Sequence, residues 1–74
     1  MTLDTFQKKF RLTERERQTA GLLSHGASRK EIAAGMGLEM CTVRFHLKNL
    51  RRKIDAPSMM AATAFCAARV SGPL

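Results

Sequence analysis

The stretch SRKEIAAGMGLEMCTVRFHLKNLRRK, from Ser28 to Lys53, decides the fold of this chain. Ser28 and Glu31 have the spacing of a capping box, in which a hydroxyl and a carboxylate each accept an amide hydrogen bond at the start of a helix. Gly37 can adopt the positive backbone angle of a tight turn, and a second helix is expected over residues 40–54. The pattern predicts a helix, a tight turn and a helix.

One face of the expected helix over residues 40–54 is apolar and the other is cationic. Apolar residues recur at spacings of three and four, which predicts one buried stripe. The stripe comprises Met40, Val43, Leu47, Leu50 and Ile54. At about 100° per residue, Phe45, Lys48 and Arg52 point away from it. Five cations lie between Arg44 and Lys53, so the basic charge of this segment forms a patch.

Two more helices flank this pair. Thr13 and Glu16 form another capping box at the start of the first, and Gly26 can end that helix in a left-handed conformation. Ser58 can cap the last helix, which covers about residues 59–70 and is apolar on nearly every side. A helix of this kind is normally buried on more than one side, which predicts a partner beyond the small core.

The chain therefore forms one all-α domain with two short extensions. Residues 1–11 are either a loose arm or a short helix, residues 12–70 a tetrahelical (four-helix) helix-turn-helix domain, and residues 71–74 a tail. With 74 residues and 45% hydrophobic content, the chain is long enough for one small core and too apolar for disorder.

The composition indicates a polyanionic partner. Thirteen Lys and Arg against six Asp and Glu give a formal net charge of +7, and nucleic acid is the commonest polyanion that such proteins bind. No apolar run approaches the roughly 20 residues of a membrane span, and the first ten residues lack the apolar core of a signal peptide. We expect a cytoplasmic protein without membrane contact, whose two cysteines stay reduced.

Three residues of the outward face are expected to contact bases in the major groove of DNA: Arg44, Phe45 and Lys48. Arg44 and Lys48 can reach base edges, with guanine as the preferred target, and Phe45 can touch a thymine methyl group. A phenylalanine opposite the core stripe is costly to leave in water. The alternatives are a solvated basic face, or packing of Phe45 on a partner protein or on the N-terminal arm.

A larger set is better placed for the DNA backbone. Free amides and the helix dipole after Ser28 attract a phosphate, although ordinary capping alone also explains Ser28. Side chains of the longer helix can reach phosphates, which fix position but carry no sequence information. The expected backbone contacts are Ser28, Arg29, Lys30, Thr42, His46, Arg51, Arg52 and Lys53.

The sequence gives no support for catalysis or for a cofactor. No nucleophile–base pair, carboxylate pair or phosphate-binding glycine loop is present. Cys41 and His46 would lie about 140° apart on their helix, so they could not easily share a metal ion. We expect no enzyme activity, no metal and no cofactor. Cys41, beside cations, is either a redox-sensitive thiol or a passive contact residue.

The last helix carries residues at helical spacing that can form a dimer interface or simply the core. Small side chains among them would let two helices approach closely in a two-fold dimer, while packing within the monomer must explain one face. These residues are Met59, Ala62, Phe65, Cys66 and Arg69. The surplus of apolar surface on this helix favours a partner.

The run LTERERQTAGLLSHGASRKEIAAGMGLEMCTVRFHLKNLRRKI resembles the DNA-binding domain of the LuxR/FixJ/GerE type. The family pattern is LTxREREVLxLLAxGxSNKEIAxxLxISxxTVKxHxxxIxxKL. It covers residues 12–54 and extends more weakly to residue 70. Matches in register include Leu12-Thr13, Arg15-Glu16, Leu22-Leu23, Gly26, Ser28, Lys30-Glu31-Ile32-Ala33, Thr42-Val43, His46 and Lys53.

The resemblance implies a four-helix domain that binds DNA as a dimer. Its third helix would read bases through Arg44, Phe45 and Lys48, and its fourth would make the dimer contact. The chain departs from the family pattern in several places. Glu39 replaces the usual Ser or Thr cap, and Asp55 stands where glycine is common. The remaining departures are Thr19 and Ala20 in place of larger apolar residues, and Met59, Met60 and Ala61 in place of a polar helix start.

Taken together, the residues and the resemblance predict a sequence-specific regulator of transcription, or its DNA-binding domain. It would bind double-stranded DNA as a homodimer on half-sites about one helical turn apart, and contact or block RNA polymerase. When bound, it would be associated with the bacterial nucleoid. The alternative is a protein-interaction module that pairs through its last helix with another regulator and inhibits it. A third hypothesis is nonspecific binding to the nucleoid.

Overall fold

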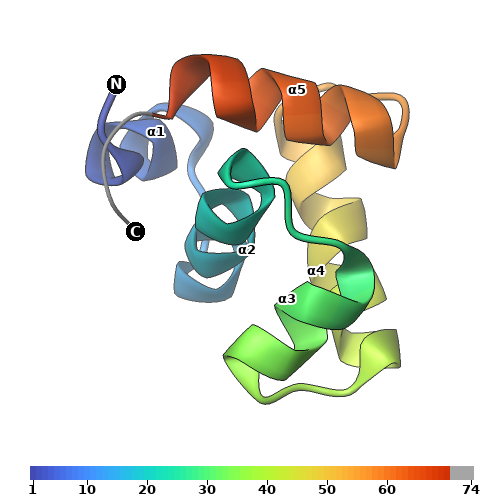
Figure 1. Ribbon diagram of the computed structural model, residues 1–74. Helices are drawn as coiled ribbons and strands as arrows, with labels where there is room; N and C mark the ends of the chain where they lie inside the picture. Colours follow the sequence, from blue (N-terminus) through green and yellow to red (C-terminus); the bar gives the residue numbers. More distant parts are fainter. Residues whose placement is uncertain (71–74) are drawn as a thin grey trace.

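Five α-helices account for most of residues 1–70, the part of the chain that the computed structural model describes (Figure 1). They are α1 (Leu3–Phe10), α2 (Glu14–Ser24), α3 (Arg29–Met36), α4 (Met40–Lys53) and α5 (Met59–Arg69). The all-helical architecture confirms the predicted fold class. At the N-terminus, where the sequence allowed a loose arm or a short helix, the structure has a short helix, α1. The tail expected at residues 71–74 lies outside the described residues.

The helix boundaries follow from local capping chemistry. In α2, the Thr13 amide donates to the Glu16 carboxylate at 2.9 Å, and the Glu16 amide donates to the Thr13 hydroxyl at 3.2 Å. The same reciprocal pair forms between Ser28 and Glu31 at the start of α3. Gly37 ends α3 with a φ of 65°, in the left-handed region that favours glycine. Both predicted capping boxes are confirmed.

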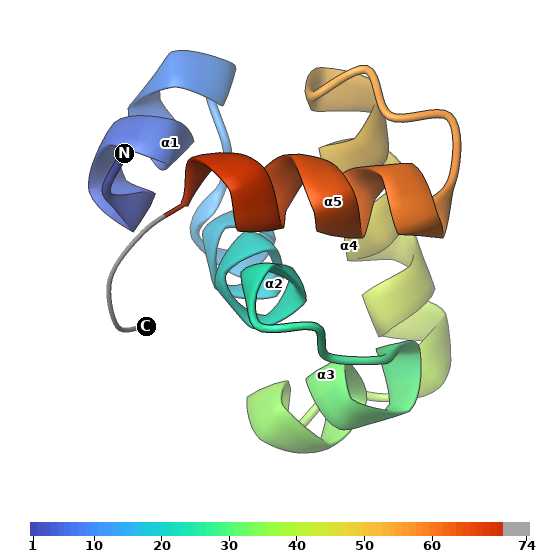
Figure 2. The ribbon, with the colours of Figure 1, turned by 45° about the horizontal axis from the view of Figure 1, so that its top comes forward.

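The core lies where α2, α4 and α5 meet. In Figures 1 and 2, α5 crosses over α2 and over one end of α4, while α3 packs beside the other end of α4. Fully buried side chains from four helices fill this space: Leu23, Ile32, Val43, Leu50, Ala62 and Cys66. Met40, expected in the core stripe, is 39% exposed. That expectation is wrong because α4 begins at Met40, at the end of the stripe, where fewer helices surround it.

The α1 helix belongs to the core. Phe6 is fully buried, and its ring lies 4.9 Å from that of Phe10 and 6.1 Å from that of Phe65, centroid to centroid. The N-terminal ammonium also donates to the Arg69 carbonyl at 2.6 Å. Burial of a Phe side chain contributes about 1.5–3 kcal/mol, so the aromatic cluster holds α1 against the last turns of α5.

Candidate nucleic-acid interface

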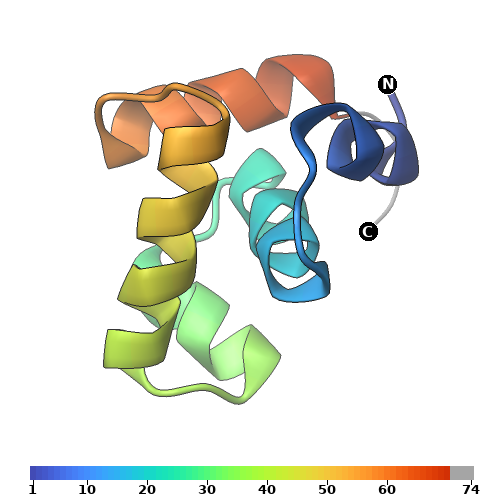
Figure 3. The ribbon, with the colours of Figure 1, turned by 180° about the vertical axis from the view of Figure 1, so that it is seen from behind.

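The outer side of α4 forms an edge of the molecule. Figures 1 and 3 show α4 from opposite sides, and in both views no other helix lies beyond it. The inner side carries the buried residues Val43, Leu47 and Leu50. The 14-residue helix α4 therefore has one long face that the other helices do not cover, called here the free face. A helix of this size fits the major groove of DNA, which is about 12 Å wide.

The free face of α4 combines an aromatic ring with cations. Phe45 is 60% exposed, and its ring lies edge-on to the neighbouring His46 ring, at 5.7 Å between centroids. Arg44, Lys48 and Arg52 are also exposed. The prediction that Phe45 points away from the core is confirmed. The alternative that this ring packs on a flexible N-terminal arm is wrong, because that segment forms α1, which packs against α2 and α5.

The start of α4 lacks the expected side-chain cap. Glu39 occupies the cap position but makes no capping hydrogen bond. Its carboxylate instead lies 3.8 Å from the Cys41 sulfur, which is also 4.0 Å from the Thr42 hydroxyl. Cys41 is exposed on the free face. The first amides of α4 thus remain without a side-chain acceptor from Glu39, which leaves them open to an external acceptor.

The residues expected to contact phosphates surround this face on two sides. Ser28, Arg29 and Lys30 are exposed at the start of α3. Thr42 and His46 are half-buried on one flank of α4. On the other flank, the Arg51 guanidinium donates to the carbonyls of Ala56 at 3.4 Å and Pro57 at 2.5 Å. Arg52 donates to the side-chain oxygen of Asn49 at 3.0 Å.

Lys53 requires a correction. Its ammonium donates to the Glu16 carboxylate at 2.6 Å and to the Arg11 carbonyl at 3.0 Å. Glu16 is only 3% exposed, so its charge depends on this partner. Lys53 therefore joins α4 to the start of α2, and we remove it from the phosphate-facing set. Local sequence patterns do not reveal this pair, because its members are 37 residues apart.

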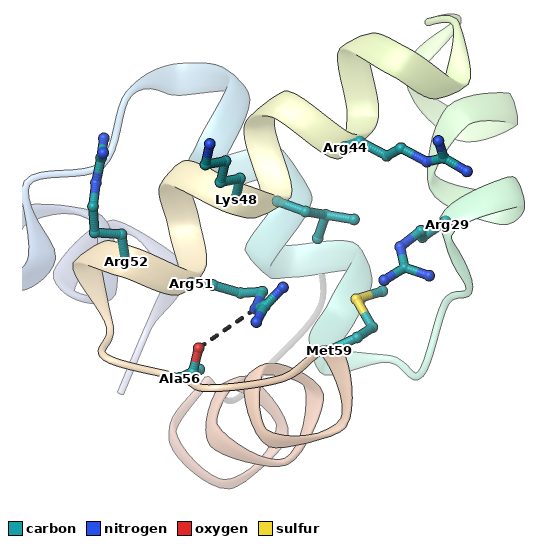
Figure 4. Close-up of a pocket in the computed structure, with 8 residues that line it drawn as sticks. Arg29, Arg44, Lys48, Arg51, Arg52, Ala56 and Met59 are labelled. Atoms are coloured by element: carbon teal, nitrogen blue, oxygen red, sulfur yellow. Dashed lines mark hydrogen bonds between the residues drawn. The ribbon is translucent and has the colours of Figure 1, made fainter.

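A concave pocket of about 650 Å³ adjoins the free face of α4 (Figure 4). It lies between the start of α3, the cationic flank of α4 and the start of α5. Its lining contains five cations, three apolar side chains and no acid: Arg29, Arg44, Leu47, Lys48, Arg51, Arg52, Ala56 and Met59. Sequence reasoning did not find this pocket, because only the tertiary fold brings Arg29 next to the flank of α4.

Most of the residues expected at a dimer interface point inward. Ala62 and Cys66 are fully buried within the monomer, and burial raises the pKa of the Cys66 thiol to about 11. Phe65 packs on Phe6 and Phe10, with the Arg69 guanidinium 3.8 Å above its ring. The predicted interface is therefore wrong for Ala62, Phe65 and Cys66. They form the inner stripe of α5, because α1 and α2 pack against that side.

The outer face of α5 carries a different apolar surface. Met60 is 83% exposed, and Ala64, Ala67 and Ala68 are exposed beside it. Met59, at the start of the helix, is half-buried in the pocket beside α4. The surplus of apolar surface expected on this helix thus lies on the face opposite to the one predicted.

Within residues 1–70, no His, Cys, Asp and Glu side chains gather in a group of three or more that could hold a metal ion. None of the helices formed by these residues is both long and apolar enough to cross a membrane.

Comparison with known proteins assigns the family. Residues 11–66, most of the chain, match the family described as bacterial regulatory proteins, luxR family. The chain belongs to this family. It is 40% identical over 57 residues to the HTH-type quorum-sensing regulator RhlR of Pseudomonas aeruginosa, and 42% identical over 52 residues to the nitrate/nitrite response regulator protein NarP of Escherichia coli. It is also 51% identical over 43 residues to the transcriptional regulatory protein UhpA of Escherichia coli.

These matches concern one part of each relative. They cover 77%, 70% and 58% of this chain but only 24%, 24% and 22% of RhlR, NarP and UhpA. The chain thus spans about a quarter of the length of the curated relatives that it matches. None of the solved structures matches it significantly. The family membership confirms the resemblance and establishes a luxR-type helix-turn-helix domain.

Proposed function

We propose that this luxR-type domain regulates transcription by binding double-stranded DNA in a sequence-specific manner, with α4 in the major groove. The observation that carries the proposal is the free face of α4, where Phe45 is 60% exposed among Arg44, Lys48 and Arg52. An exposed aromatic ring on a cationic helix is unfavourable in water and favourable against base edges.

The electrostatics of the molecule support a duplex as the ligand. The net charge of +7 gives a field that attracts polyanions over a distance of about 10 Å at moderate salt. Exposed cations at the start of α3 and along α4 lie beside one another, because Arg29, Arg44, Lys48 and Arg52 line the same pocket. Contacts from these cations to phosphates would fix the position of α4, and the side chains of its free face would read sequence.

Arg44, Phe45 and Lys48 are the proposed base-reading residues. Arg44 and Lys48 are one turn apart and exposed, and Phe45 lies beside them. Ser28, Arg29, Lys30, Thr42, His46, Arg51 and Arg52 are the proposed contacts to the DNA backbone. The free amides at the start of α4 would donate hydrogen bonds to a phosphate at the same edge.

The proposed assembly is a homodimer formed by the outer face of α5. A second copy is the expected occupant, because the surface is apolar, lacks charged residues and is made of small side chains around Met60. Two such helices can approach closely across a two-fold axis. The dimer would place two α4 helices on half-sites about one turn of DNA apart.

One observation favours a second candidate function, a protein-interaction module that inhibits another regulator. Met60 is 83% exposed on an apolar helix face, which suits a different regulator as well as a second copy. Salt separates the two functions. Binding to DNA should weaken steeply as salt rises, because counterions are released from the phosphates, whereas apolar contacts of α5 should change little.

A mobility-shift assay with single alanine variants tests the base-reading assignment. Lys48→Ala should weaken binding to the preferred sequence by roughly tenfold or more, because a good base contact contributes about 1–3 kcal/mol of discrimination. Arg44→Ala should act similarly. Lys8→Ala is the matched control, since Lys8 is an exposed cation on α1, away from α4. Equal affinities and sequence preferences for Lys48→Ala, Arg44→Ala and Lys8→Ala would contradict the assignment.

A further inference from the structure

Three arginines from different parts of the fold converge on the pocket beside α4. Arg29 comes from the first turn of α3, Arg44 from the second turn of α4, and Arg51 from the last turn of α4. Figure 4 shows Arg29, Arg44 and Arg51 around the space next to Met59, with Lys48 and Arg52 projecting from the outer side of α4. Within residues 1–70, no acidic side chain lines this pocket. The guanidinium groups of Arg29 and Arg44 make no hydrogen bond or ion pair with any of these residues.

The Arg51 side chain is held in place before any ligand arrives. It donates to the Ala56 carbonyl at 3.4 Å and to the Pro57 carbonyl at 2.5 Å, and these bonds fix it against the connection between α4 and α5. A preorganised arginine loses little conformational entropy when it binds an anion. The pocket therefore contains one fixed guanidinium and two whose charges are not neutralised by the protein.

The floor of the pocket is apolar. Leu47 is buried, with 3% of its surface exposed, and Ala56 and Met59 are half-buried. A groove that only follows a phosphate backbone needs cations but no apolar floor, whereas this pocket has both. It suits a small molecule that has both a chain of phosphates and a flat apolar group. The volume of about 650 Å³ also lies in the range of small-molecule sites, about 300–1,000 Å³.

We propose that this pocket binds a nucleoside polyphosphate. The phosphates would lie among Arg29, Arg44 and Arg51, where guanidinium groups can make charge-assisted, bidentate hydrogen bonds. The base would rest on Ala56 and Met59, the two half-buried apolar residues of the lining. Because Arg44 and Lys48 also belong to the proposed base-reading face, the bound nucleotide would exclude DNA. This competition rests on the proposed function, whereas the nucleotide site does not.

Titration with GTP in the absence of DNA tests the site. At near-physiological salt, GTP should bind saturably at one site and shift the backbone amide signals of Leu47, Ala56 and Met59. Arg29→Ala should weaken GTP binding by about tenfold, the effect of one lost charge-assisted contact. Lys8→Ala removes the same charge from α1 and should leave the affinity unchanged. If GTP does not saturate, or if Arg29→Ala and Lys8→Ala bind it equally, the site does not exist.

Inorganic tripolyphosphate separates a nucleotide site from a general attraction for phosphate. The chain should bind it more weakly than GTP, and Met59→Ala should weaken GTP binding while leaving tripolyphosphate binding unchanged. Equal affinities of the wild type for both ligands would overturn the nucleotide assignment.

GTP should also displace a labelled duplex, and GTP binding without displacement would overturn the competition. A chain that binds GTP but no DNA at any salt would instead contradict the proposed function.

Discussion

At the scale of single residues, Glu16 connects the start of the fold to the end of α4. It is 3% exposed, and its carboxylate accepts hydrogen bonds from the Thr13 amide and, at 2.6 Å, from the Lys53 ammonium. Burial by itself would raise the pKa of this carboxyl, but the hydrogen bonds from Lys53 and Thr13 and the charge of Lys53 outweigh it, and the pKa is lowered from 4.5. The ionised form is therefore the one that the fold stabilises.

This lowered pKa predicts acid sensitivity. As the pH falls, Glu16 is protonated in the unfolded chain before it is protonated in the folded one, near pH 4.5. The stabilisation of the fold by the Glu16–Lys53 pair is therefore complete above that pH. It is lost as the pH falls through the lower pKa of the folded state. Lys53→Ala should cost about 1–2 kcal/mol at neutral pH, less than the 3–5 kcal/mol of a fully buried pair, because Lys53 is partly exposed. The free energy of unfolding of the Lys53→Ala variant should also depend less on pH below 4.5 than that of the wild type.

Urea unfolding across a pH series measures both effects. Lys8→Ala is the control, because it removes an exposed cation that makes no ion pair in residues 1–70. A Lys53→Ala variant with the stability and acid dependence of the control would show that the Glu16–Lys53 pair contributes nothing.

The roles of individual residues could be predicted where they depend on neighbours in sequence. Both capping boxes and the outward position of Phe45 follow from spacings of three and four residues. The role of Lys53 could not be predicted, because its partner is 37 residues away. Thr19, which replaces a larger apolar residue of the family pattern, is buried with its hydroxyl bonded to the Arg15 carbonyl at 2.8 Å. The core thus accommodates this departure without an unpaired hydroxyl.

At the scale of elements, the end of α4 contains a strained residue. Asp55 has a φ of 58°, in the left-handed region that glycine favours. The left-handed conformation costs a residue with a side chain about 1–2 kcal/mol. Asp is among the more tolerant residues, and its amide still donates to the Arg52 carbonyl at 3.3 Å. This position explains why glycine is common there in the family pattern.

Asp55→Gly should therefore stabilise the fold by about 0.5–1 kcal/mol, after the greater freedom of glycine in the unfolded chain is subtracted. Thermal unfolding measures the change. Gly37→Ala is the opposite experiment, because Gly37 has a φ of 65° and a Cβ there would meet no atom within 4 Å. Its expected destabilisation of about 1 kcal/mol comes from the backbone alone. A neutral or destabilising Asp55→Gly would refute the account of this turn.

The α5 helix shows which part of an element the sequence does not determine. Its composition predicted surplus apolar surface, and exposed Met60 confirms that part. The face that turns inward could not be predicted, because both faces are apolar. The choice depends on α1, whose residues Phe6 and Phe10 receive Phe65. A helix that is apolar on both faces gives no local signal for which face turns inward.

At the scale of the whole molecule, the proposed homodimer depends on the outer face of α5. Ala64→Glu adds a charge to this face at an exposed position, so it should leave the monomer folded and weaken dimerisation by at least tenfold. Gln18→Glu on α2, also exposed, is the control with the same change in charge. Sedimentation at matched concentrations measures the assembly. A monomeric wild type, or equal association of both variants, would contradict the homodimer.

The central claim, that the free face of α4 reads DNA sequence, is tested most directly by selecting bound duplexes from a random pool, with wild type and Lys48→Ala in parallel. The wild type should enrich a motif with two-fold symmetry and half-sites about one helical turn apart. Lys48→Ala should relax the preference at one position in each half-site and leave the spacing unchanged. If the wild type enriches no motif, or if Lys48→Ala enriches the same motif equally well, α4 does not read bases as described.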